Sequence, residues 1–262
     1  MIDIGINFTD KAFQNDLLDV INQANQAGVS HMIVTGTDVT GSQAAQLLCE
    51  HHPECLFATA GVHPHYAKTW NKEVADQIKR LLAHPQVVAA GETGLDFNRD
   101  FSPRPAQEHA FREQLQLAAA SSKPLFLHER DAFTNQYGIL KEFRPQITNA
   151  VVHCFTGNEA ALKAYLDLDL YIGITGWICD ERRGRELQSL VTYIPDDKLL
   201  IETDGPYLLP RDLKPKPKSR RNEPKYLSHI AATIARLRNQ PIDTLVSNTR
   251  NNTIRCFNLP ID

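Results

Sequence analysis

The 262-residue chain contains few cysteines, and they show no spacing that would give them a shared role. There are five, and no two of them form a C-x-x-C pattern. An odd number without that pattern argues against a disulfide framework and against a zinc finger, and it fits a reducing compartment.

The sequence also lacks apolar segments of the kind used for targeting or membrane insertion. Residues 1–13 contain no basic segment followed by an apolar run, so we expect no signal peptide. No apolar run approaches the length of a membrane span. We therefore expect a cytoplasmic protein that has no membrane partner.

Net charge is small. At −3, the chain as a whole is not a polycation. Any binding of nucleic acid must therefore use a local basic patch, a bound cation, or both.

Short apolar runs alternate with longer segments of helical period along the chain. The expected strands are residues 3–7, 32–36, 56–61, 87–91, 124–128, 150–153, 170–174 and 199–202. They are apolar or β-branched, which is typical of strands buried on both faces. Amphipathic segments such as 12–27 and 107–120 lie between them, and Asp10, Ser102 and Asn158 stand where helix N-caps are expected.

Eight regular alternations predict one α/β domain over residues 1–262, a (β/α)₈ TIM barrel. A doubly wound open sheet is the alternative. The regular units and the lack of a glycine-rich phosphate-binding fingerprint favour the closed barrel.

Polar side chains suited to metal binding stand at the carboxyl ends of the expected strands. They are His63 and His65 after the third strand, Glu92 and Asp96 after the fourth, His128 and Arg130 after the fifth, His153 after the sixth, and Glu202 and Asp204 after the eighth. In a (β/α)₈ barrel these ends meet on one face, which carries the active site.

Taken singly, these residues have ordinary explanations, such as a hydrogen-bonded core histidine or a turn-forming aspartate. Packed together, buried carboxylates and imidazoles need a neutralising charge, and a divalent cation supplies it. We predict Glu92, His128, His153 and Asp204 as ligands of zinc, manganese or a related ion. Such an ion activates water; Asp204 is a candidate to accept the proton, and Glu92 can bridge if two ions bind.

For the other polar residues near these strand ends, the sequence leaves two alternative roles open. His63 is expected to contact a substrate phosphate or to protonate a leaving oxygen, and His65 either binds substrate or faces solvent. Arg130 either pairs with a phosphate or forms an ion pair with Asp131 or Asp96. Glu202 and Asp96 are expected to support the ligands from behind.

The segment 210–224 contains four prolines and reads as a long loop after the last strand. The basic residues of this segment, together with Lys225 directly after it, are Arg211, Lys214, Lys216, Lys218, Arg220, Arg221 and Lys225. Beside a metal site they favour an anionic polymer as substrate, with Arg221 as a substrate contact, although such runs are often only solvated. Aromatic residues that either stack bases or fill the core are Tyr66, Phe155, Trp177 and Tyr207.

At these residues the sequence resembles the TatD family of metal-dependent nucleases, which are amidohydrolase-like barrels. The matching motifs are GVHPH at 61–65, GETGLDF at 91–97, HERDAF at 128–133, HCFTG at 153–157, YIGITGW at 171–177, ETDGPYL at 202–208 and RRNEP at 220–224. The resemblance implies a cytoplasmic, magnesium-stimulated deoxyribonuclease. It further implies a 3′–5′ exonuclease preferring single-stranded DNA and RNA, with a part in DNA repair.

One position departs from the family pattern. Most members carry H-x-H after the first strand, and here Gly5 and Asn7 stand at those places. Glycine has no ligating side chain, whereas an asparagine carbonyl suits a hard ion such as Mg²⁺. We therefore expect Mg²⁺ before Mn²⁺ or Zn²⁺, and either one or two ions.

Three functions can be weighed. Phosphodiester hydrolysis is favoured by the basic loop and the ligand set, and we expect the enzyme to act as a monomer. Hydrolysis of an ester or amide, for example an aminoacyl-tRNA, is the alternative on the same barrel, because fold alone does not determine chemistry. A non-catalytic binding module is disfavoured by the full set of ligands with a candidate base.

Overall fold

The computed structural model describes residues 1–261, and in it eight parallel strands form one sheet in the order β1 to β8. The strands are β1 Ile2–Ile6, β2 His31–Val34, β3 Leu56–Ala60, β4 Val87–Asp96, β5 Leu125–Arg130, β6 Ala150–Val152, β7 Tyr171–Ile174 and β8 Leu199–Ile201. The segment after β8 returns to β1: the Asp204 amide donates to the Gly5 carbonyl at 2.9 Å, and the Asn7 amide donates to the Gly205 carbonyl at 2.8 Å. The prediction of a (β/α)₈ barrel is thus confirmed, and the barrel is nearly closed. The alternative of an open sheet is excluded.

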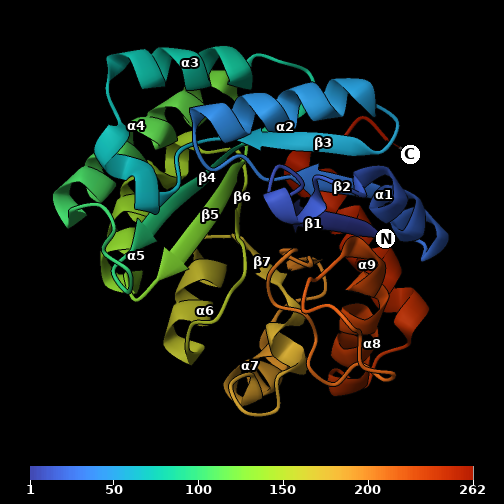
Figure 1. Ribbon diagram of the computed structural model, residues 1–262. Coiled ribbons are helices and arrows are strands. Elements are labelled where there is room, and N and C mark those ends of the chain that lie inside the picture. Colours follow the sequence, from blue (N-terminus) through green and yellow to red (C-terminus); the bar gives the residue numbers. More distant parts are fainter. Residues whose placement is uncertain (262) are drawn as a thin grey trace.

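Helices lie around the outside of the ring of strands (Figure 1). The α-helices are α1 Leu17–Gln26, α2 Val39–His51, α3 Lys72–Leu82, α4 Arg104–Ser121, α5 Phe133–Phe143, α6 Glu159–Asp167, α7 Arg185–Leu190, α8 Leu227–Leu237 and α9 Ile242–Phe257. Short 3₁₀ helices are η1 Lys11–Phe13, η2 Pro64–Thr69, η3 Arg144–Gln146, η4 Gly176–Cys179, η5 Val191–Tyr193 and η6 Pro224–Tyr226. Over residues 1–261, no helix is both long and apolar enough to cross a bilayer.

Two layers of core follow from the alternation of side chains along each strand. Residues such as Ile2, Ile4 and Phe126 pack inside the barrel, where Phe257 of α9 joins them. On β2, Ile33 belongs to the inner cluster, and Met32 and Val34 on either side of it pack against the surrounding helices. Because α9 packs against β1 and β8 near this inner cluster, one end of the barrel is filled, and the carboxyl ends of the strands remain for the site.

The main difference from the expected strands is the length of β4, which runs to Asp96 and not to residue 91. A Cβ on Gly91 would lie 2.3 Å from the Phe126 carbonyl oxygen, and one on Gly94 would lie 2.0 Å from the His128 carbonyl oxygen. Both residues have a positive φ, at 145° and 143°. Glycine therefore lets β4 continue against β5, which places Glu92 within a strand.

The predicted helix starts are correct in part. Asn158 caps α6 by accepting from the Ala161 amide, as expected. Asp10 caps η1, and the regular helix of the segment 12–27 begins only at Leu17. The Ser102 prediction is wrong, because Pro103 is the N-cap of α4. The Ser102 hydroxyl instead links the Lys68 amide to the His65 carbonyl, and so fixes η2 to the loop between β4 and α4.

Candidate metal centre

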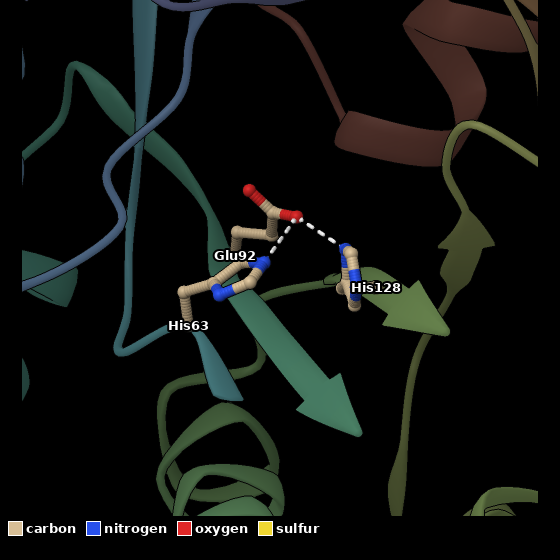
Figure 2. A group of neighbouring side chains, drawn as sticks. All are labelled: His63, Glu92 and His128. Carbon is tan, nitrogen blue, oxygen red and sulfur yellow. Dashed lines mark hydrogen bonds and ion pairs between the residues drawn. The ribbon is translucent and has the colours of Figure 1, made fainter. Parts of the chain in front are cut away.

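Three imidazole nitrogens converge on one carboxylate oxygen at the carboxyl ends of β3 to β6. Glu92 Oε1 lies 2.8 Å from His153 Nε2, 2.9 Å from His128 Nδ1 and 3.3 Å from His63 Nε2. Figure 2 shows His63 and His128 pointing toward Glu92 from neighbouring segments. All of these side chains are buried or mostly buried, which makes the cluster a candidate metal centre.

A carboxylate stands behind each of the two candidate histidine ligands. His128 Nε2 lies 3.4 Å from Asp96 Oδ2, and His153 Nδ1 lies 3.4 Å from Glu202 Oε2. Glu202 Oε1 also accepts from the Cys154 amide at 2.6 Å. Such partners fix the orientation of a ligating ring and raise its basicity. The expectation that Asp96 and Glu202 lie behind the ligands fits this geometry.

The hydrogen bonds of His63 determine where its proton lies. Its Nδ1 accepts from the His65 amide at 3.0 Å, so the proton of the neutral ring is on Nε2, which faces Glu92. Burial lowers the pKa of His63 to about 4, although Glu92 opposes the shift. The residue is therefore a neutral hydrogen-bond donor at neutral pH.

The buried carboxylates and imidazoles of the cluster stabilise each other's charged forms. Burial would raise the pKa of Glu92, but His63 and His153 hold it well below its usual value. Burial would lower the pKa of His153, but Glu92 and Glu202 raise it well above its usual value. Buried carboxylates thus draw positive charge onto the rings. A divalent cation would supply that charge, and the mixed nitrogen and oxygen donors fit one.

Asp204 follows β8 and lies beside this cluster. Burial raises its pKa to about 7, with His153 opposing the shift and Glu202 and Glu92 adding to it, so its carboxyl is within electrostatic reach of all three. Asn7 Nδ2 donates to Asp204 Oδ1 at 3.1 Å. Asn7 therefore holds Asp204 in place through its amide, a role that differs from the carbonyl ligand considered from sequence.

The predicted substrate-binding residues have three different environments. His65 Nε2 lies 2.8 Å from Asp96 Oδ2, and its ring packs edge-on against Phe101 at 4.7 Å, so it borders the cluster. Arg130 is exposed at the end of β5, opposite Asp96 in the backbone register of β4 and β5. Within residues 1–261 its side chain forms no ion pair.

Arg221 does not join the cluster. Its guanidinium donates to both carboxylate oxygens of Asp16, at 2.8 and 2.7 Å, to Glu223 Oε1 and to the Ala12 carbonyl. These bonds tie the proline-rich segment to η1 and to the N-cap of α1. The structure therefore gives Arg221 structural partners that occupy its donors.

Sequence reasoning missed Phe101, which is 57% exposed beside His65 and follows no strand-end motif. Tyr66 and Tyr207, which were considered, are also exposed. Phe155 is buried in the core, and the Trp177 ring is covered by the Arg183 guanidinium at 4.5 Å. Only a test of side-chain exposure, which the sequence does not give, separates these aromatic residues.

A (β/α)₈ barrel with a His–Glu–His cluster at the carboxyl ends of its strands defines a hydrolase of the kind that can hold a metal ion. The family model described as TatD related DNase matches residues 2–258. The chain belongs to this family and is a nuclease of it.

Relatives cover the whole chain. The protein named 3′-5′ ssDNA/RNA exonuclease TatD in Erwinia tasmaniensis is 51% identical over 259 residues, which is 99% of this chain and 100% of the relative. The protein of the same name in Klebsiella pneumoniae is 50% identical over 262 residues, covering 100% and 99%.

Solved structures agree. The TatD homologue YjjV from Escherichia coli superposes with a TM-score of 0.90 at 29% identity, covering 99% of this chain and 98% of that one. A TatD family hydrolase from Entamoeba histolytica gives 0.89 at 28% identity, covering 98% and 97%.

Proposed function

We propose that the protein is a metal-dependent exonuclease that hydrolyses phosphodiester bonds of single-stranded DNA and RNA from the 3′ end. The observation that carries this proposal is the convergence of three imidazole nitrogens on Glu92 Oε1 at the face where a barrel enzyme has its active site. The substrate and polarity rest on full-length relatives named for that activity.

The proposed metal ligands are Glu92, His128, His153 and Asp204, and Mg²⁺ is the first candidate, with Mn²⁺ and Zn²⁺ as alternatives and one or two ions bound. When bound, such an ion lowers the pKa of water and polarises the phosphodiester. Of these ligands, Asp204 is also the proposed proton acceptor, because Asn7 holds one of its oxygens and leaves the other for water.

The remaining residues orient and bind. His63 presents its Nε2 proton toward the centre, from where we propose that it donates a hydrogen bond to a phosphate oxygen. Asp96 and Glu202 keep the rings of His128 and His153 in place. We propose that His65 and Arg130, at the border of the cluster, bind the nucleic-acid strand where it extends away from the metal centre. Arg221 is not included among the substrate-binding residues, because its donors are occupied.

We further propose a monomeric, cytoplasmic enzyme that trims damaged DNA during repair. Every proposed ligand comes from one chain, so no second copy is needed to complete the centre. All five cysteines are free, which suits a reducing compartment.

The test is cleavage of a 5′-labelled single-stranded oligonucleotide with Mg²⁺, Mn²⁺, Zn²⁺ or EDTA. We compare the wild type with Glu92→Ala and with Glu73→Ala, which changes an exposed glutamate of α3. The proposal is supported if the wild type and Glu73→Ala give a ladder that shortens from the 3′ end, and if EDTA and Glu92→Ala each abolish it. If folded, metal-loaded wild type leaves the strand intact but hydrolyses an ester or amide, such as an aminoacyl-tRNA, the alternative hydrolase takes its place.

A further inference from the structure

Three exposed aromatic rings gather at the rim of the candidate metal centre. Tyr66 is 44% exposed, Phe101 57% and Tyr207 55%. Large rings left in water forgo the free energy that burial would give them. Of the exposed large aromatic residues within 1–261, the remaining one is Tyr193 in η5, which follows α7.

Each ring is fixed next to a residue of the centre. Tyr66 follows His65 in η2, and its amide donates to the His63 carbonyl at 2.8 Å. The Phe101 ring contacts the His65 ring at 4.7 Å, and the His65 ring lies 4.2 Å from that of His63. Phe101 and Tyr66 therefore flank His65.

Tyr207 completes the series from the other side of the centre. Its amide donates to the Asp204 carbonyl at 3.0 Å, so it stands three residues beyond a proposed ligand. Its hydroxyl donates to Asp10 Oδ2 at 3.4 Å, which holds the ring against the loop that follows β1. Tyr207 therefore borders the centre beside Asp204, as Tyr66 and Phe101 border it beside His65.

We propose that Tyr66, Phe101 and Tyr207 form a base-stacking subsite that holds the nucleotides nearest the scissile bond and selects single strands. This inference rests on the proposed function. Aromatic rings bind the faces of all bases, so the subsite tolerates any sequence. Bases within a duplex are already stacked on one another, and only an unpaired strand can offer its faces to these rings.

Charges near the rim suit the backbone of such a strand. Arg130 is exposed at the end of β5, and Lys68 in η2 reaches toward the Phe101 carbonyl at 3.4 Å. Cations beside stacking rings are the usual arrangement for single-stranded nucleic acid. Asp10 and Asp100 lie on the same rim, but Arg104 pairs with Asp100.

The experiment varies protein and substrate together. Wild type, Tyr66→Ala, Phe101→Ala and Tyr207→Ala act with Mg²⁺ on a normal oligonucleotide and on one whose last two 3′ residues are abasic. Tyr193→Ala is the matched control, since it removes an exposed ring elsewhere. Tyr66→Phe and Tyr207→Phe keep the ring and remove the hydroxyl.

Loss of one stacking ring should lower kcat/KM on the normal strand by about 5- to 100-fold, mainly through KM. The abasic strand should be a poor substrate for the wild type and should lose nothing further in the alanine variants. Tyr193→Ala should match the wild type, and Tyr66→Phe and Tyr207→Phe should keep more of kcat/KM than the alanine variants at the same positions.

Two results would overturn the subsite, and they differ from failure of the nuclease itself. One is wild-type cleavage of normal and abasic strands with equal kcat/KM; the other is an equal loss on both strands in the alanine variants. A protein that cleaves neither strand refutes the proposed function, and with it the subsite.

Discussion

Replacing Arg221 with alanine should destabilise the protein and leave its catalysis intact. The sequence suggested a substrate contact because the residue lies in a basic segment. In the structure its guanidinium pairs with Asp16 and Glu223, bonds the Ala12 carbonyl at 2.6 Å, and covers the Phe13 ring at 5.1 Å. The side chain is only 19% exposed, so these contacts are largely shielded from water.

The size of the effect follows from the partners. The Asp16 side chain is 39% exposed, so this pair is weak. The Glu223 side chain is 8% exposed, and without Arg221 it keeps only Lys225, at 2.7 Å, as an ion-pair partner among residues 1–261. Losing one partner of a buried carboxylate and the bond to a carbonyl costs roughly 2–3 kcal/mol. For a chain of this size that corresponds to a fall in Tm of about 5–10 °C.

Thermal unfolding followed by circular dichroism measures the fall, and cleavage of a single-stranded oligonucleotide at 20 °C measures catalysis. Lys218→Ala is the control, because Lys218 is an exposed cation of the same segment. We expect Lys218→Ala to match the wild type in Tm, and Arg221→Ala to keep wild-type kcat/KM. An unchanged Tm with a raised KM for Arg221→Ala would refute the structural role and restore the sequence-based interpretation.

Three further outcomes are expected. Glu202→Gln should weaken metal binding about 10- to 100-fold, measured by titration calorimetry with Mn²⁺, because the His153 ring loses its anionic partner; unchanged affinity would contradict this. Burial raises the pKa of Asp3 from 3.8 to about 7, so the folded protein holds a proton that the unfolded chain has released. The free energy of unfolding should therefore fall with rising pH across that range, by up to ~4 kcal/mol, and level off above it. Urea unfolding of Asp3→Asn, compared with the wild type, should lack this part of the slope; identical slopes would exclude Asp3 as its source. Finally, Mn²⁺ at 100 times its Kd should stabilise the wild type by ~2.7 kcal/mol, and Glu92→Ala should show no such rise in Tm.

The sequence could predict the strands and the ends on which the polar residues stand. Apolar runs report burial on both faces, and a closed parallel barrel brings all carboxyl ends to one side. His63, Glu92, His128 and His153 therefore meet as expected. The barrel geometry alone predicts that these four side chains lie close together, without information on individual contacts.

Contacts that depend on distant partners could not be predicted in this way. The Asp16 partner of Arg221 lies 205 positions away, and no local pattern joins the two. The extension of β4 to Asp96 depends on how closely Gly91 and Gly94 approach β5, which is a property of packing. The exposure of Phe101 is of the same kind.

The absence of histidine from β1 also has a structural reason. Glu202 is fully buried, and Cβ atoms built on Gly5 and Gly173 would lie 2.5 and 2.7 Å from its two carboxylate oxygens. Glycine on each neighbouring strand thus makes room for a glutamate that points into the barrel. Any side chain at position 5 would displace the carboxylate that faces His153. Gly5 of β1 gives space to Glu202, and Asn7, which follows β1, holds Asp204. This part of the chain thus supports the centre through two carboxylates that other strands supply.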